Sequence, residues 1–248
     1  MKPDVTIVIP TYNEAGRIGS TLEQLAKFLK AEKIKAEVLV VDAQSPDGTA
    51  SEVLKYKKDF DSLSLIDAGP KPKGKFIKGR QVKMGMLEAK GDYVIFMDAD
   101  LATPLKYIKD AMSELKSGKQ VAICVRDLQK SHKGLRKLVS GTGNLLVQML
   151  LLPGIKDTQC GFKAFSKQAT NVVFPAQTID GWGFDMEILA IARKRGYSIG
   201  LIEVPDWQDI KEGSKISGSS PIKASLQTFG DLINIRWGFL RGRYKVKK

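Results

Sequence analysis

Short apolar runs alternate with segments of helical periodicity through the first half of the chain. Runs rich in β-branched and aromatic residues and bounded by polar or turn residues predict buried strands. The predicted strands are Val5–Ile9, Val38–Val41, Leu63–Ile66, Tyr93–Met97 and Val121–Val125. The predicted helices between them are Arg17–Lys30, Ala50–Tyr56, Val82–Ala89 and a helix from Pro104 to about Leu115. This alternation predicts an α/β fold with a single, mostly parallel sheet flanked by helices.

The second half is less regular and closes with an amphipathic helix. Its predicted elements are the helix Leu135–Leu152, the turn and short strand Asp157–Phe165, the helix Phe184–Arg195, the strand Ser198–Ile202, the loop Lys211–Ser220 and the helix Pro221–Leu240. One stripe of the last helix is expected to face the core, namely Ile222, Leu226, Phe229, Ile233 and Leu240. Ile235 and Phe239 lie on another side and Trp237 flanks the stripe, so we expect part of this helix to touch a bilayer interface. Most of Leu145–Leu152 is expected to pack in the core.

The balance of charge points to an anionic partner. The chain has 248 residues, 43% of them apolar, with 40 Lys and Arg against 27 Asp and Glu, which gives a net charge of +13. Nucleic acid, an acidic membrane surface and phosphorylated substrates all suit that charge. Two separated cysteines and a single histidine argue against a zinc site or a Ser-His-Asp triad.

No part of the chain reads as a membrane span. A span needs about 18 or more uninterrupted apolar residues, and the longest apolar stretch, Leu145–Pro153, is too short. No signal peptide opens the chain, because Met1–Asp4 runs directly into a strand. We therefore expect a cytoplasmic protein whose membrane contact is peripheral, at the cytoplasmic face.

Two carboxylates follow the strand Tyr93–Met97. Asp98 and Asp100 are one residue apart, so in strand geometry their side chains point the same way. Carboxylate oxygens at a strand end suit Mg²⁺ or Mn²⁺. Other polar residues, among them Tyr12, Glu14 and Asp42, also follow predicted strands. In parallel sheets ligands bind beyond those ends, so this clustering predicts a site.

The first strand–helix turn lacks the pattern of a dinucleotide-binding domain. Pro10–Gly19 contains no G-x-G-x-x-G, and the chain has no G-x-x-x-x-G-K-[ST] phosphate loop. Glu14 would repel a phosphate at this turn. The turn is therefore better suited to a base or a ribose, and a metal on Asp98 and Asp100 would neutralise a diphosphate.

Several motifs together resemble family 2 glycosyltransferases with the GT-A fold. The motifs are Val8–Glu14, Val41-Asp42 with Ser45–Thr49, and Asp98-Ala99-Asp100. Three further stretches resemble the polyprenyl-phosphate sugar synthases, namely Asp157–Lys163, Trp182–Glu187 and Gly213–Lys215. The likeness is greatest to dolichyl-phosphate glucosyltransferases, followed by dolichyl-phosphate mannose synthases, and it covers about Val5 to Arg243. It implies a GT-A catalytic domain over 1–220 and a membrane-interface element, the helix and basic tail, over 221–248.

The resemblance implies an inverting transfer of a hexose, glucose before mannose, from a nucleotide sugar such as UDP-glucose or GDP-mannose to a polyprenyl phosphate. Pro10, Tyr12, Glu14 and Asp42 would line the base and ribose, with Lys83 and Lys215 near the donor. Asp98 and Asp100 would hold the metal, with Asp100 the direct ligand. Arg126, Arg136 and Ser140 would meet the acceptor phosphate. Asp185 would be a base for a hydroxyl acceptor or would only orient groups for a phosphate acceptor.

The sequence departs from the family pattern at three points, and two other functions stay open. Ala43 replaces a frequent second Asp, Ala102 stands where mannose synthases often carry Gln, and no C-terminal transmembrane helix is present. One alternative is transfer to a sugar hydroxyl with Asp185 as base, although the Q-x-x-R-W motif of processive relatives is absent. The other is a basic nucleic-acid-binding protein. It ranks low because the basic loop Lys71–Arg80 has a single aromatic residue, so no nucleic acid is expected as partner.

Overall fold

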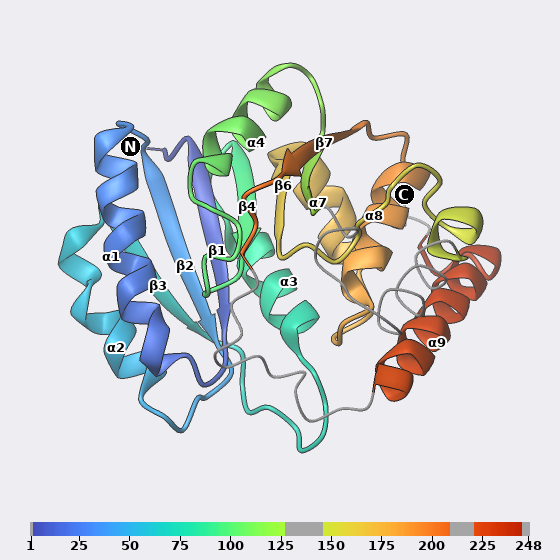
Figure 1. Ribbon diagram of the computed structural model, residues 1–248, viewed down its shortest axis with the longest axis horizontal. Coiled ribbons are helices and arrows are strands. Elements are labelled where there is room, and N and C mark those ends of the chain that lie inside the picture. The colour runs from blue at the N-terminus through green and yellow to red at the C-terminus, as the bar shows by residue number, and fades with distance from the viewer. Residues whose placement is uncertain (1, 127–145, 209–220, 245–248) are drawn as a thin grey trace.

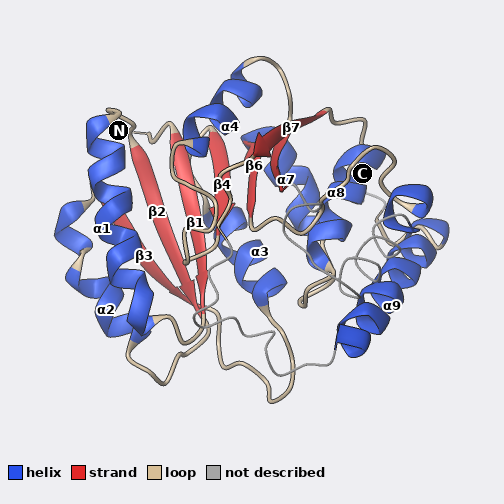
Figure 2. Cartoon of the chain, viewed as in Figure 1, coloured by secondary structure: helices blue, strands red, loops and turns tan. Residues whose placement is uncertain are grey.

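A seven-stranded sheet forms the centre of the molecule (Figures 1 and 2). The computed structural model describes residues 2–126, 146–208 and 221–244, with only the backbone for 221–228. The strands are β1 (Val5–Thr11), β2 (Ala36–Asp42), β3 (Ser62–Asp67), β4 (Tyr93–Met97), β5 (Val121–Arg126), β6 (Phe162–Ser166) and β7 (Ile199–Val204). The helices are α1 (Ala15–Ala31), α2 (Thr49–Lys55), α3 (Lys78–Glu88), α4 (Tyr107–Lys116), α7 (Lys167–Ala176), α8 (Phe184–Lys194) and α9 (Pro221–Leu240). These elements confirm the predicted α/β fold.

The strands run in the order β3-β2-β1-β4-β6-β5-β7, and all but β6 are parallel to one another. β6 is antiparallel to both of its neighbours, β4 and β5. The carboxyl ends of β1, β2 and β4 therefore meet at one edge, and the chain enters β6 at that same edge. This arrangement brings residues just before β6 against the end of β4.

Alternating strand residues feed two apolar cores, one on each face of the sheet. Ile7, Val38 and Ile95 belong to the core beneath α1, α2 and α4. Val8 and Phe96, their neighbours in sequence, belong to the core beneath α3, α7, α8 and α9. Both faces are buried because successive side chains of a strand point to opposite faces, and each face is covered by helices.

Three local predictions differ from the structure. α7 was not predicted, because its apolar run Val172-Val173-Phe174 is β-branched and aromatic and is followed at once by Pro175. α3 begins at Lys78, within the segment expected to be a loop. The predicted helix Leu135–Leu152 falls mostly outside the described residues, and only 146–150 is seen to be helical. There Val147 and Leu152 are buried while Met149 and Leu150 are exposed, so the expectation that most of this segment lies in the core was wrong.

The packing of α9 differs from the prediction except at Trp237, which is exposed as expected. Phe229, Ile233 and Leu240, expected in the core, are exposed, and Ile235, expected at a bilayer interface, is fully buried. The helix is apolar on more than one side, so its sequence does not say which side packs. Leu232 and Ile235 pack against the core that covers α8. Ile222 and Leu226 lie outside the described side chains. No helix in residues 2–126, 146–208 and 221–244 is long and apolar enough to cross a membrane.

Candidate active site

The loop after β2 occupies the N-terminus of α1. The Asp47 carboxylate accepts hydrogen bonds from Ala15 N (3.0 Å), Thr49 N (3.0 Å) and Thr49 Oγ1 (2.6 Å). Thr49 Oγ1 in turn accepts a hydrogen bond from Glu14 N at 2.9 Å. Burial opposes the charge of Asp47, but the bonds from Thr49 and Ala15 outweigh it and lower the pKa. An aspartate thus stands where a dinucleotide-binding fold holds its pyrophosphate, which agrees with the absence of the glycine fingerprint.

The residues predicted to line the base and ribose lie in or just after the carboxyl ends of β1 and β2. Pro10 is buried and pairs with Val41, beyond the last residue at which β1 pairs with β4. A proline is tolerated there because one side of the strand is no longer in a ladder. Tyr12 lies under Lys71, whose Nζ is 4.7 Å from the ring centroid. Glu14 forms an ion pair of 2.9 Å with Arg17.

Asp42 is engaged in ordering its own loop. Its carboxylate accepts hydrogen bonds from Thr11 Oγ1 (2.9 Å), Ser45 N (2.8 Å) and Ser45 Oγ (2.6 Å). It is buried, so these bonds offset the cost of desolvating it. Asp42 therefore fixes the shape of the loop over the ends of β1 and β2.

Asp98 and Asp100 stand at the carboxyl end of β4, as predicted. Lys78, the first residue of α3, places its Nζ 2.5 Å from Asp98 Oδ1. Asp98 N donates to Gly161 O at 3.0 Å, and a Cβ built on Gly161 would lie 1.9 Å from Asp98 Oδ2. Asp100 Oδ1 accepts a hydrogen bond from Ala102 N at 3.0 Å. The position of Asp98 is thus set from two sides, by α3 and by the segment entering β6.

Asp98, Asp100 and Lys78 form what we call the mouth of the site, which holds two carboxylates and one ammonium group. Burial, followed by the charge of Asp98, raises the pKa of Asp100. Burial alone would lower the pKa of Lys78, but attraction to Asp98, Asp185 and Asp100 outweighs it and raises the pKa. Lys78 is therefore a fixed cation facing three carboxylates.

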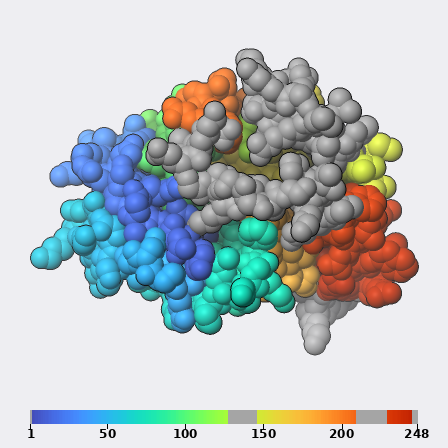
Figure 3. Space-filling model, turned by 60° about the horizontal axis from the view of Figure 1, so that its bottom comes forward, coloured from blue at the N-terminus to red at the C-terminus, as the bar shows by residue number. Residues whose placement is uncertain are grey.

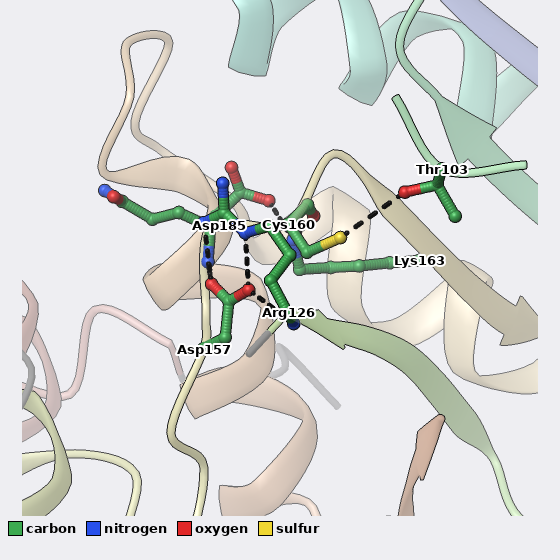
Figure 4. A network of polar contacts seen from close by, with 7 residues as sticks. Thr103, Arg126, Asp157, Cys160, Lys163 and Asp185 are labelled. Carbon is green, nitrogen blue, oxygen red and sulfur yellow. Dashed lines mark hydrogen bonds and ion pairs between the residues drawn. The ribbon is translucent and has the colours of Figure 1, made fainter. Parts of the chain in front are cut away.

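Arg126, at the end of β5, is held by Asp157 in a two-pronged ion pair (Figure 4). Arg126 Nε and Nη2 donate to the two Asp157 oxygens at 2.7 and 2.9 Å, and Arg126 N donates at 3.0 Å. The guanidinium also lies 5.1 Å from the ring of Trp207. Burial opposes the charge of Asp157, but Arg126 outweighs it and lowers its pKa. Arg126 is thus a rigidly placed cation with 20% of its side chain exposed.

A fully buried lysine forms the floor of the site. Lys163 comes from β6 and places its Nζ 2.5 Å from Asp185 Oδ1 and 2.7 Å from Cys160 O (Figure 4). It also lies 5.3 Å from the ring centroid of Phe96. Burial raises the pKa of Asp185, against the opposing effects of Lys163 and then Lys78. Asp185, a predicted candidate base, is therefore already paired with a buried cation.

The sequence prediction missed Lys78 and Lys163, and the structure shows what Lys83 contacts. Lys83 Nζ donates to the backbone carbonyl of Gln177 at 2.7 Å, so it ties α3 to the end of α7. Lys78 is one of several basic residues in Lys71–Arg80. No sequence signal separates Lys78 from its basic neighbours, because its place at the start of α3, beside Asp98, appears only in the fold.

Three predicted site residues lie outside the described residues, namely Arg136, Ser140 and Lys215. Within the part of the chain that the structure describes, no group of three or more His, Cys, Asp or Glu side chains is arranged to hold a metal ion. Asp98 and Asp100 are the two adjacent acids that remain as candidate ligands.

Carboxylates at the carboxyl end of a central strand suit a phosphorylated ligand held through a divalent cation. The comparisons with known proteins identify the family. Residues 6–174 match the family described as glycosyl transferase family 2, so the chain belongs to that family. A dolichyl-phosphate beta-glucosyltransferase of Dictyostelium discoideum is 33% identical over 260 residues, covering 98% of this chain and 77% of that protein. The dolichyl-phosphate beta-glucosyltransferase of Homo sapiens is 30% identical, with coverage of 98% and 78%.

Solved structures share the fold. Glucosyl-3-phosphoglycerate synthase of Mycobacterium tuberculosis, in complex with Mn²⁺, uridine diphosphate and glucosyl-3-phosphoglycerate, has a TM-score of 0.70 at 18% identity, covering 94% of this chain and 80% of that chain. Mannosyl-3-phosphoglycerate synthase of Rubrobacter xylanophilus has a TM-score of 0.72 at 14% identity, with coverage of 99% and 77%. These likenesses confirm the GT-A fold.

Proposed function

We propose that this protein transfers glucose, with inversion, from UDP-glucose to dolichyl phosphate or a related polyprenyl phosphate. The single observation that carries the proposal is the likeness over 98% of the chain to dolichyl-phosphate beta-glucosyltransferases. The carboxylates at the end of β4 and the cations Lys78 and Arg126 support it, because this reaction brings two anions together. Transfer to a sugar hydroxyl is not favoured by these relatives.

The residues at the mouth fit a divalent cation. Asp98 and Asp100 are carboxylates one residue apart at the carboxyl end of β4, the kind of oxygen ligand that hard divalent cations prefer. Mg²⁺ and Mn²⁺ favour a few carboxylates completed by water and phosphate oxygens, so two protein ligands suffice. Solved relatives in fold are crystallised with Mn²⁺ or Mg²⁺ and uridine diphosphate. When bound, the ion would neutralise the diphosphate of the donor.

Residues of the chain would bind the donor diphosphate, the acceptor phosphate, and the base and ribose. Lys78, which pairs with Asp98 in the structure, would meet the donor diphosphate. Arg126 is held by Asp157 and would present its exposed edge to the acceptor phosphate. We assign Arg136 and Ser140 to the same phosphate, and Lys215 and Lys83 to the donor side. Pro10, Tyr12, Glu14 and Asp42 would shape the pocket for base and ribose.

Asp185 acts in this scheme as an orienting group. A phosphate monoester is ionised near neutral pH, so a phosphate nucleophile needs little help from a general base. Asp185 is bonded to Lys163, which is itself without exposed surface. Its charge would hold Lys163 and attract Lys78, which belongs to the diphosphate side of the site.

The proposal is tested by incubating the purified protein with polyprenyl phosphate, Mg²⁺ or Mn²⁺, and either UDP-glucose or GDP-mannose. A glucosylated lipid, detected by mass spectrometry, is expected only with UDP-glucose and should disappear with EDTA. A mannosylated lipid would overturn the sugar assignment. Failure of both donors, in protein that still binds UDP in the presence of Mn²⁺, would overturn the acceptor assignment.

A further inference from the structure

Helix α8 carries a second buried carboxylate, Glu187, which lies outside the groups assigned to substrates. None of its surface is exposed. Its oxygens accept hydrogen bonds from Thr178 N (3.0 Å to each oxygen), Thr178 Oγ1 (2.6 Å) and Ile179 N (2.8 Å). The hydroxyl of Tyr244 donates to it at 2.9 Å. A carboxylate is costly to bury unless its oxygens are hydrogen-bonded, so these bonds hold Thr178 and Ile179 against α8.

The segment that Glu187 holds also caps the N-terminus of α3. Ile77, the residue before α3, forms no side-chain cap. The backbone carbonyl of Asp180 accepts hydrogen bonds from Gly79 N at 2.8 Å and from Arg80 N at 3.4 Å instead. The first N–H groups of a helix have no partner within the helix. A carbonyl from a distant part of the sequence therefore stabilises the first turn of α3.

The contact between this segment and α3 is closely packed. Gln177 Nε2 donates to Gly79 O at 2.9 Å and to Ile179 O at 3.0 Å. A Cβ built on Gly79 would lie 2.5 Å from Ile179 O and 2.7 Å from the Cβ of Phe184. Because no space separates the two backbones, a shift of the segment would also shift the first turn of α3.

Lys78 is the first residue of that turn. Its Nζ lies 2.5 Å from Asp98 Oδ1 and 5.6 Å from the ring centroid of Trp182. Trp182 follows Asp180 by two residues, so the same part of the chain caps the backbone beside Lys78 and supplies a ring next to its ammonium group. A continuous series of contacts therefore joins Glu187 to the mouth.

The series of contacts reaches the far side of the molecule through Tyr244. Burial, followed by the charge of Glu187, raises the pKa of Tyr244 to about 12, so its hydroxyl stays protonated and donating. The ring of Tyr244 packs 4.5 Å from the ring of Phe239 on α9. Figures 1 and 3 show orange parts of the chain between the teal α3 and the red α9. The segment held by Glu187 thus bridges the two helices.

We propose that Glu187 is a positioning residue for Lys78. It holds Thr178–Asp180, this segment caps α3, and the capped turn places the ammonium group of Lys78 beside Asp98. A long, flexible side chain binds an anion more weakly when its backbone is not fixed, because more freedom is lost on binding. Glu187 would thereby strengthen the binding of the donor diphosphate without touching it, a consequence that rests on the proposed function.

Hydrogen exchange tests the positioning itself. In Glu187→Gln the amides of 79–82 are expected to exchange at least about tenfold faster than in the parent protein, since the cap is no longer held. The matched control is Glu37→Gln. Glu37 is 3% exposed, accepts hydrogen bonds from Thr6 Oγ1 (2.8 Å) and Lys90 N (2.9 Å), and lies near the amino end of β2, away from the mouth.

The control should lose stability without a change in exchange at 79–82. Equally fast exchange in both variants, or no change in Glu187→Gln, would overturn the proposal. Thr178→Val is a milder variant that removes only the bond from the hydroxyl, and exchange should be about threefold faster in it. If Glu187→Gln does not fold, unchanged exchange in Thr178→Val would overturn the proposal.

A double-mutant cycle tests whether Glu187 acts through Lys78. With saturating Mn²⁺, calorimetry should show UDP-glucose binding about fivefold weaker in Glu187→Gln than in the parent protein, and unchanged in Glu37→Gln. In the Lys78→Met background, Glu187→Gln should weaken binding no further. Equal weakening in both backgrounds would overturn the proposal. A parent protein that binds no UDP-glucose would overturn the proposed function instead, and the exchange measurement would then decide this inference by itself.

Discussion

The mouth and the floor of the candidate site each hold a lysine–aspartate pair, and the two pairs differ in burial rather than in length. Lys78 and Asp98 lie 2.5 Å apart at the mouth, with 16% and 37% of their side chains exposed. Lys163 and Asp185 lie 2.5 Å apart at the floor, with 0% and 2% exposed. The same chemical pair thus occurs in two different environments within one cluster of charges.

The difference separates an exchangeable pair from a permanent one. At the mouth, water and incoming ions can replace either partner, so the bond adds little stability. At the floor, removal of one partner leaves a buried charge that nothing solvates. We therefore assign ligand binding to Lys78 and Asp98 and the support of that surface to Lys163 and Asp185. The following predictions test this division, from the largest expected effect to the smallest.

Asp100→Asn tests the mouth most severely. The change keeps the shape of the side chain but removes a charge proposed to hold the cation, so glucosyl transfer is expected to fall about a thousandfold, equivalent to about 4 kcal/mol. Initial rates with saturating Mn²⁺ measure the loss. Asp92→Asn is the control, because Asp92 is exposed at the opposite end of β4 and pairs with Lys2. Activity near that of the control would exclude Asp100 as a ligand.

Lys163→Met tests the floor. Asp185 would remain buried without its cation, and the free energy of unfolding is expected to fall by about 3–5 kcal/mol, measured by urea denaturation. Lys163→Met/Asp185→Leu should recover most of the loss, because no buried charge remains. As a control, Lys55→Met breaks an exposed pair with Glu52 and should leave the midpoint unchanged. A double variant no more stable than the single one would show that the pair is not the source of the effect.

Gly161→Ala tests how closely Asp98 is positioned. The added Cβ would lie 1.9 Å from Asp98 Oδ2, so that carboxylate must move. Displacements of about 1 Å can cost about a hundredfold in rate, so we expect a loss of about ten- to a hundredfold together with weaker Mn²⁺ binding. Gly230→Ala on α9 is the control, since nothing lies within 4 Å of its added Cβ. Unchanged Mn²⁺ affinity in Gly161→Ala would contradict this account.

Lys78→Met should have two effects of opposite sign. Without the ammonium group, Asp98 and Asp100 attract cations more strongly, so Mn²⁺ alone should bind about three- to tenfold tighter by calorimetry. UDP-glucose in the presence of saturating Mn²⁺ should bind about tenfold weaker, because a cation near the diphosphate is lost. Weaker binding of both ligands would show that Lys78 shapes the mouth rather than competing for it.

Asp231→Asn is expected to give the smallest effect. It compares the lysine–aspartate pair at the floor with a carboxylate, Asp231, that lies near a second carboxylate, Glu187. Burial, followed by the nearby charge of Glu187, raises the pKa of Asp231 above 3.8. The folded protein then holds this proton more tightly than the unfolded chain, so stability is lost as the pH rises from 3.8 through the raised pKa. At neutral pH Asp231→Asn should slightly raise the melting temperature, and the gain should vanish as the pH falls toward 3.8. A gain that persists in acid would exclude the charge as its cause.

The sheet and the two acids of the mouth were predictable because local patterns encode them. Asp98 and Asp100 follow an apolar strand directly, and each predicted strand of the first half appears in β1 to β5. Asp42 was predicted by the same reasoning, although its bonds to Thr11 and Ser45 depend on how two loops meet.

The floor and the faces of α9 were not predictable for a different reason. Lys163 lies within an apolar strand, where a lysine normally points to solvent, and only the antiparallel insertion of β6 between β4 and β5 buries it. On α9 the two apolar sides have similar composition. The side that packs is the one whose Leu232 and Ile235 meet residues of α8, which are distant in sequence.

The antiparallel strand also sets the order in which the protein can fold as it is synthesised. β4 meets its neighbour β6 only after β5 and a long connection have been made, and both neighbours of β5 come later than β5 itself. A nascent chain that stops before residue 162 therefore carries one sheet with an open edge at β4 and a solitary apolar strand. The middle of the sheet, on which the site rests, closes late through contacts distant in sequence, and that step is slow and prone to aggregation. Chaperone occupancy should accordingly be greatest on chains that end between β5 and β6.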